Sequence, residues 1–123
     1  MLKGQLYNIK KINKQNNTVE AIIELNDQHE IFQGHFPDQP ILPGVCILLM
    51  VREILETALN KKLFLSKADE IRFIEMIDPN KNNEIKFDIQ IKQTDAQQIN
   101  SNAKILNNKN VVCGKVKASY KII

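Results

Sequence analysis

Cysteine is scarce in this chain of 123 residues, which contains only Cys46 and Cys113. Two cysteines cannot build the disulfide framework of a small secreted domain, and their spacing matches no metal-binding motif. Both lie among apolar residues, where buried free thiols are expected. We therefore expect no metal site, and no motif in the chain calls for a cofactor.

The chain also lacks a strong excess of charge and a long apolar run. A net charge of +3 is too small to predict a nucleic-acid partner, although it is compatible with an acidic protein partner. The longest apolar run is interrupted by Pro43 and Gly44 and is too short to span a bilayer. The first residues lack the basic and then apolar pattern of a signal peptide. We expect a cytoplasmic protein with no membrane partner.

Repeats, linkers and low-complexity tracts are absent as well, and the composition is that of an ordinary soluble domain. Hydrophobic residues make up 43% of the chain and charged residues 25%. We expect residues 1–123 to form a single domain, which is long enough to bury a core.

Hydrophobic periodicity predicts six strands and one long helix. Apolar and polar residues alternate most clearly over Thr18–Leu25 and Glu84–Lys92. The other predicted strands are Leu6–Ile12, Leu63–Ile74, Gln97–Leu106 and Val111–Ile123. The order of two strands, one helix and four strands predicts an α+β domain whose antiparallel sheet wraps round the helix.

The predicted helix begins at Gly44 or Val45 and ends near Leu59, with Asn60 as a left-handed stop. Its first two turns are apolar on every side, so we expect them to be enclosed. No Ser, Thr, Asp or Asn precedes the helix to cap it. Either solvent or a bound oxygen must then accept hydrogen bonds from its first N–H groups.

The stretch that enters this helix is stiff, apolar and carries a titratable group. It reads Gln-Gly-His-Phe-Pro-Asp-Gln-Pro-Ile-Leu-Pro-Gly-Val-Cys over residues 33–46. Its prolines fix φ and remove N–H donors, while Gly44 allows close approach of the backbone to another group. A rigid apolar loop that holds His35 has the properties of a small-molecule site.

This stretch resembles the signature of the short beta-hydroxyacyl-[acyl-carrier-protein] dehydratases, which are hot-dog-fold enzymes of fatty acid synthesis. The resemblance covers Gly34-His35-Phe36-Pro37, then Pro40-Ile41 and Pro43-Gly44-Val45, and outside this stretch only the element order agrees. It implies a single hot-dog domain that forms a dimer with the active site at the subunit interface. It also implies a tunnel for an acyl chain on phosphopantetheine and an acidic acyl carrier protein as partner.

The resemblance also implies roles for individual residues. His35 corresponds to the catalytic histidine of the family. The N–H groups of Gly44 and Val45 correspond to the donors that hold the thioester carbonyl. Phe36, Pro43 and Leu49 are the other residues that we expect to contact the substrate.

The chain departs from the family at the second catalytic group. The family has Glu or Asp on the central helix, five residues after the glycine of the Pro-Gly pair, and here that position is Leu49. The nearest carboxylate on the same helix face is Glu53, one turn further and about 5.4 Å away. Glu53 is thus a candidate catalytic residue, provided that the substrate or the helix is shifted.

Three hypotheses remain open at this point. The first is a dehydratase that uses His35, with or without Glu53, and works slowly because an acid is missing. The second is an acyl thioesterase of the same fold, for which the sequence offers no separate support. The third is a non-catalytic or half-site subunit that binds the acyl carrier protein. We expect the chain to form a homodimer or a larger oligomer of dimers, and the third hypothesis also allows a heterodimer with another hot-dog subunit.

Overall fold

The computed structural model describes residues 2–34 and 40–123. Within these residues the chain forms six strands and two helices. In chain order they are β1 (Tyr7–Gln15), β2 (Thr18–Leu25), α1 (Ile31–Gly34), α2 (Gly44–Leu59), β3 (Leu63–Phe73), β4 (Glu84–Asp95), β5 (Gln98–Leu106) and β6 (Val112–Ile122). The predicted order of two strands, one long helix and four strands is confirmed.

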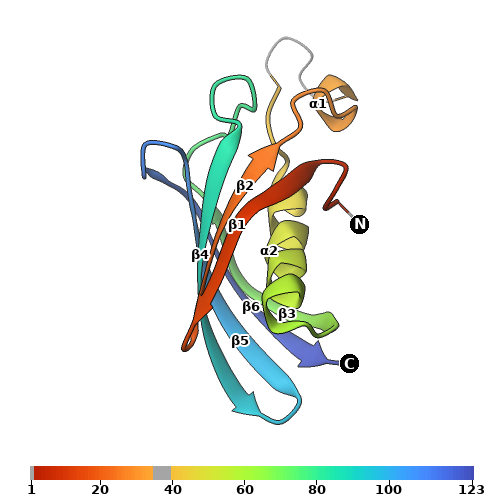
Figure 1. Ribbon diagram of the computed structural model, residues 1–123, viewed down its shortest axis with the longest axis vertical. Coiled ribbons are helices and arrows are strands. Elements are labelled where there is room, and N and C mark those ends of the chain that lie inside the picture. Colours follow the sequence, from red (N-terminus) through yellow and green to blue (C-terminus); the bar gives the residue numbers. More distant parts are fainter. Residues whose placement is uncertain (1, 35–39) are drawn as a thin grey trace.

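The six strands form one sheet in the order β1-β2-β4-β5-β6-β3, and every neighbouring pair is antiparallel. After α2 the chain crosses to the far side of the sheet, so β1 and β3 become its two edges. The sheet curves, and α2 lies across its concave face (Figure 1). The α+β architecture predicted from the sequence is therefore confirmed.

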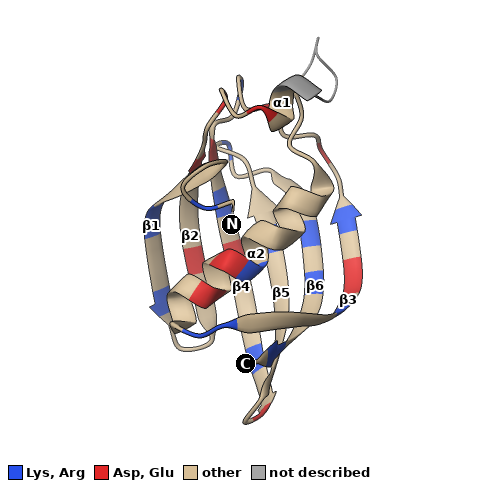
Figure 2. Ribbon diagram, turned by 90° about the vertical axis from the view of Figure 1, so that its right-hand side faces the viewer, with Lys and Arg blue, Asp and Glu red and all other residues tan. Residues whose placement is uncertain are grey.

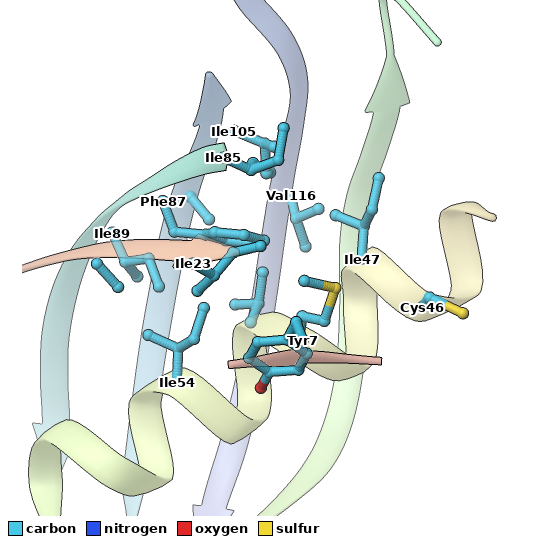
Figure 3. Close-up of a cluster of buried hydrophobic side chains, with 14 of the residues drawn as sticks. Tyr7, Ile23, Cys46, Ile47, Ile54, Ile85, Phe87, Ile89, Ile105 and Val116 are labelled. Atoms are coloured by element: carbon cyan, nitrogen blue, oxygen red, sulfur yellow. The ribbon is translucent and has the colours of Figure 1, made fainter. Parts of the chain in front are cut away.

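The core lies between α2 and the inner face of the sheet (Figure 3). Alternate residues of β2 and β4 point inward, as the sequence pattern predicts for strands with one buried face. Val19, Ile23, Ile85, Phe87 and Ile89 are fully buried there. Both tyrosines of the chain, Tyr7 and Tyr120, are also fully buried within this core.

The strand boundaries differ from the prediction at the first hairpin. We expected the strand to end at Ile12, but β1 continues to Gln15, and only Asn16 and Asn17 remain in the turn. Asn16 adopts a φ of 55°, a left-handed conformation that asparagine tolerates well. The short helix α1 was not predicted, because four residues carry no detectable periodicity.

Helix α2 begins at Gly44 and ends at Leu59, as predicted. Asn60 follows with a φ of 52° and donates its N–H to Glu56 O, which is the predicted left-handed stop. The prediction that the first two turns are enclosed is wrong for a single chain, because Val45 is 63% exposed. The sheet covers only one side of α2, and Figure 2 shows the uncovered first half of the helix without charged residues. Among the described residues, no helix is long and apolar enough to cross a membrane.

Candidate functional site

The start of α2 is the part of the predicted site that the structure describes. The predicted catalytic residue His35 and the predicted substrate contact Phe36 lie outside the described residues. The structure does place Pro43, Gly44, Val45, Leu49 and Glu53, which the sequence analysis also assigned to the site.

The first turn of α2 has N–H groups that no side chain caps. Pro43 occupies the N-cap position in an extended conformation and has no side-chain acceptor. Its carbonyl oxygen accepts from the N–H groups of Cys46 and Ile47 at 3.1 and 3.3 Å. No described residue accepts from the N–H of Gly44 or Val45. These two dipoles, at the positive end of the helix, can therefore bind an oxygen that carries partial negative charge.

An apolar cavity of about 450 Å³ opens at this helix start. Two short segments line it, residues 41–44 and 73–77, together with Ile47. Glu75 is the only charged residue among them. The volume and lining suit a small organic ligand that is mostly apolar. Other hollows in the described residues lie on the outer face of the sheet or beside its turns, and polar residues outnumber apolar ones around each of them.

Gly44 has no side chain because the ring of Phe73 occupies the adjacent space. A Cβ atom placed on Gly44 would lie 2.3 Å from Phe73 Cε2 and 2.4 Å from Phe73 Cζ. Any side chain at Gly44 would force this ring away from the helix start. The sequence indicated a close approach at Gly44, and the structure identifies the approaching group as Phe73.

Leu49 lies half-buried on α2, on the side that the sheet does not cover. It stands one turn after the exposed Val45 and one turn before Glu53, so the three residues follow one another along the helix. The side chain of Leu49 can neither donate nor accept a proton. At this position the chain can offer a substrate only an apolar contact.

Glu53 is 2% exposed, and its carboxylate is held by the N-terminal part of the chain. Its Oε2 accepts from the N–H of Leu2 at 3.0 Å, and its Oε1 accepts from the N–H of Lys3 at 2.9 Å. The hydroxyl of Tyr7 also donates to Oε1, at 2.9 Å. Three donors satisfy a buried charge that would otherwise be costly. Burial and the hydrogen bond to Glu53 raise the pKa of Tyr7 far above its ordinary value.

The sequence suggested Glu53 as a residue of the site, and the structure adds that its carboxylate has hydrogen-bond partners within the fold. The partners that explain its burial are two backbone N–H groups and the hydroxyl of a core tyrosine. Arg52, its neighbour on α2, instead forms a wide ion pair with Glu56, with 3.9 Å between Nε and Oε1. The prediction that Glu53 is catalytic stays a prediction, and catalysis would require release of these hydrogen bonds.

Neither cysteine has the surroundings of a nucleophile. Cys46 and Cys113 are both buried and unpaired, as predicted. Burial raises the pKa of the Cys46 thiol, and burial together with nearby Glu75 raises the pKa of the Cys113 thiol. Both thiols therefore stay protonated near neutral pH, and protonated thiols are poor nucleophiles.

Comparison with known families gives a match to the model of the ApeI-like family, described as ApeI dehydratase, over residues 11–114. The chain is similar to curated proteins named 3-hydroxyacyl-[acyl-carrier-protein] dehydratase FabZ. The protein from Histophilus somni is 36% identical over 77 residues, which cover 56% of this chain and 51% of that protein. The protein from Shewanella pealeana is 31% identical over 84 residues, which cover 60% of this chain and 54% of that protein. The chain spans about half the length of the curated relatives that it matches.

Comparison with solved structures confirms the hot-dog fold. The dehydratase heterocomplex ApeI:P from Xenorhabdus doucetiae aligns with a TM-score of 0.69 and 17% identity, covering 92% of this chain and 96% of that chain. The PaaI protein of Escherichia coli aligns with a TM-score of 0.71 and 13% identity, covering 99% of this chain and 83% of that chain. A thioesterase from Haemophilus influenzae aligns with a TM-score of 0.69 and 12% identity, covering 97% of this chain and 80% of that chain. At these identities the likeness concerns the fold alone.

Proposed function

Because the chain belongs to the ApeI-like dehydratase family, we propose that it removes water from 3-hydroxyacyl thioesters and releases trans-2-enoyl thioesters. The observation that carries this proposal is the uncapped start of α2 at the mouth of an apolar cavity. We further propose that an acyl carrier protein delivers the substrate on its phosphopantetheine arm. The cavity of about 450 Å³ has room for a pantetheine thioester and the first carbons of its acyl chain.

The proposed reaction needs a base, an acid and donors for an oxyanion. A base removes a proton from C2, the C2–H electron pair becomes the C2–C3 double bond, and the C3–O bond breaks. The departing hydroxyl takes a proton and leaves as water. Negative charge builds on the thioester oxygen meanwhile, and the N–H groups of Gly44 and Val45 are the proposed donors for it. One such donor is worth roughly 10²–10³ in rate.

His35 is the proposed base, since an imidazole titrates near neutral pH and can both accept and return a proton. With Leu49 at the acid position, one imidazole would have to carry the C2 proton to the departing hydroxyl. The absence of a positioned acid typically lowers the rate by about 10²–10⁴. We therefore propose a slow dehydratase in which Pro43 and Leu49 supply apolar contacts to the acyl chain.

Leu49 also favours a second candidate function, that of a half-site subunit. In a hot-dog dimer with a shared site, a partner subunit could donate the carboxylate while this chain donates its helix start. The edge strand β3 is the proposed contact, because no described strand pairs with its outer edge and it exposes Ile71.

The test is conversion of 3-hydroxybutyryl-carrier-protein to the enoyl product by four proteins: wild type, His35→Ala, Leu49→Glu and Glu53→Gln. We expect slow turnover by wild type, loss of turnover in His35→Ala, and a gain of about 10–10³ in Leu49→Glu. Glu53→Gln should change stability more than rate. No turnover by wild type together with clear turnover by Leu49→Glu would contradict the enzyme proposal and favour the half-site subunit. Equal rates for wild type and His35→Ala would contradict the assignment of the base.

A further inference from the structure

Phe73 is the last residue of β3, and its ring fills the gap between the sheet and the first turn of α2. On the sheet it lies opposite Gly114 of β6. A Cβ atom placed on Gly114 would lie 3.6 Å from Phe73 Cδ1, whereas one placed on Gly44 would lie 2.3 Å from Phe73 Cε2. Because Cδ1 and Cε2 are opposite corners of one ring, the ring spans the distance between the two glycines.

This ring has backbone on two sides and is open on a third. Gly44 and Gly114 lie beside opposite edges of the ring, because a Cβ atom placed on either residue would come within 4 Å of it. Phe73 is nevertheless 50% exposed and lines the cavity at the helix start. Met76, which lines the same cavity and is 70% exposed, has a flexible side chain that can adapt to a ligand. Phe73 is therefore the less flexible of these two side chains in the wall.

The Phe73 ring lies close to the expected position of C2, the carbon next to the thioester carbonyl of the proposed substrate. Gly44 carries an N–H group proposed to bind the thioester oxygen, and a Cβ atom placed on this same residue would lie 2.3 Å from the edge of the Phe73 ring. The carbon next to the thioester carbonyl is C2, from which the proposed reaction takes its proton. A substituent on C2 of a thioester bound at this N–H would thus lie beside the ring.

We propose that Phe73 determines specificity at C2 of the acyl group, admitting thioesters that carry only hydrogen there and excluding 2-methyl thioesters. This inference rests on the proposed binding of a thioester at Gly44. A wall residue that rejects one additional methyl group in an apolar pocket typically discriminates by roughly 10–200-fold. Phe73→Leu should leave the fold intact. The smaller side chain would free space beside Gly44 for the 2-methyl group of the thioester.

The experiment compares two thioesters that cannot react because they have no 3-hydroxyl group, butyryl-pantetheine and the enantiomers of 2-methylbutyryl-pantetheine. Dissociation constants would be measured by calorimetry for wild type, Phe73→Leu and the control Phe64→Leu. Phe64 is a matched control because it lies on the same strand and is similarly exposed, at 58%, but pairs with Lys121 on the outer face. Thermal unfolding would verify that both variants are folded.

We expect wild type to bind butyryl-pantetheine at least about tenfold tighter than either 2-methyl compound. In Phe73→Leu the ratio should fall to about threefold or less, and in Phe64→Leu it should equal that of wild type. The inference is overturned if wild type binds the compounds equally or binds neither, or if Phe73→Leu keeps the wild-type ratio.

A parallel assay of 3-hydroxybutyryl-pantetheine turnover separates this inference from the proposed reaction. Selectivity that depends on Phe73 without any turnover would support the role of Phe73 and contradict the dehydratase proposal. Turnover by wild type, together with a selectivity that Phe73→Leu leaves unchanged, would support the dehydratase proposal and contradict the role of Phe73.

Discussion

The hydroxyl of Tyr7 donates a hydrogen bond of 2.9 Å to Glu53 Oε1, inside the fold. The same carboxylate accepts from the N–H groups of Leu2 and Lys3. Glu53 thereby attaches the residues before β1 to the middle of α2. This buried charge is the clearest polar determinant of stability in the described core.

The two buried tyrosines provide a matched pair of variants. Tyr7→Phe removes a hydrogen bond to a buried carboxylate and should lower the free energy of unfolding by about 1–3 kcal/mol. Tyr120→Phe should leave it unchanged or raise it by up to about 1 kcal/mol, because no described residue forms a hydrogen bond with Tyr120 Oη. Nearby Ser101 donates its hydroxyl to Ala118 O instead. Urea unfolding would measure the free energy of unfolding of both variants. Equal decreases in Tyr7→Phe and Tyr120→Phe would contradict this difference between the two hydroxyls.

Substitution of Glu53 should loosen the N-terminal residues before it affects the rest of the fold. Glu53→Gln places an amide N–H₂ group near donors that need an acceptor, so we expect a loss of about 2–4 kcal/mol in unfolding free energy. Hydrogen exchange should show faster exchange of the Leu2, Lys3 and Gln5 amides. Glu20→Gln on the outer face of β2 is the control, since its side chain is 52% exposed. Unchanged exchange at Leu2 and Lys3 would refute the anchoring role.

Alkaline pH should destabilise the fold through the same two tyrosines. Burial raises the pKa of Tyr120 to about 12, and burial and Glu53 raise the pKa of Tyr7 further. A tyrosine in the unfolded chain ionises near pH 10, so the contribution of each is complete below that pH. It is lost as pH rises towards the folded-state pKa, by about 1.4 kcal/mol per pH unit for each tyrosine.

Urea unfolding between about pH 9 and pH 11.5 would measure this decline. Tyr120→Phe should show a shallower decline than wild type, because one of the two ionisations is removed. An identical slope in wild type and Tyr120→Phe would show that Tyr120 is not linked to folding.

The contact between Gly44 and Phe73 predicts that two substitutions are coupled. Gly44→Ala should lower the free energy of unfolding by about 1–3 kcal/mol, since the new Cβ would lie 2.3 Å from Phe73 Cε2 and must displace the ring. In a Phe73→Ala background the same substitution should cost less than about 0.5 kcal/mol, because alanine is well tolerated in a helix. A double-mutant cycle by urea unfolding measures the coupling. Strictly additive effects would mean that the ring moves aside without cost.

The exposed edge of β3 predicts self-association. Ile71 is 43% exposed although it lies opposite the buried Val116, so we expect a second subunit to cover it. Ile71→Lys should convert a dimer to a monomer in analytical ultracentrifugation. Ile22→Lys is the control, because Ile22 is half-buried on β2 between Lys11 and Lys86, far from this edge. Dissociation by the control, or a dimer that survives Ile71→Lys, would contradict this interface.

Much of the fold could be predicted because its signals are local. The alternation in β2 and β4 follows from one buried face, and Asn60 ends α2 because asparagine tolerates a left-handed conformation. The uncapped start of α2 could likewise be deduced from the residues before Val45. These features need no knowledge of which segments meet in space.

The contacts that were missed connect distant parts of the chain. The amide donors that satisfy Glu53 come from residues 51 and 50 positions away, and backbone N–H groups leave no trace in a sequence. The ring that explains Gly44 belongs to a residue at the end of β3, where aromatic side chains are common in any strand. The exposure of Val45 was missed because an all-apolar helix turn does not show which of its sides the sheet covers.

Because both native cysteines are buried, the chain is suitable for site-specific labelling with a fluorescent dye at an introduced cysteine. Cys46 and Cys113 are each 3% exposed, and their raised pKa values slow reaction with maleimides near neutral pH. A cysteine introduced by Met76→Cys would replace a side chain that is 70% exposed at the cavity beside α2. An environment-sensitive dye attached there would change its emission whenever an acyl group entered, without removal of either native thiol.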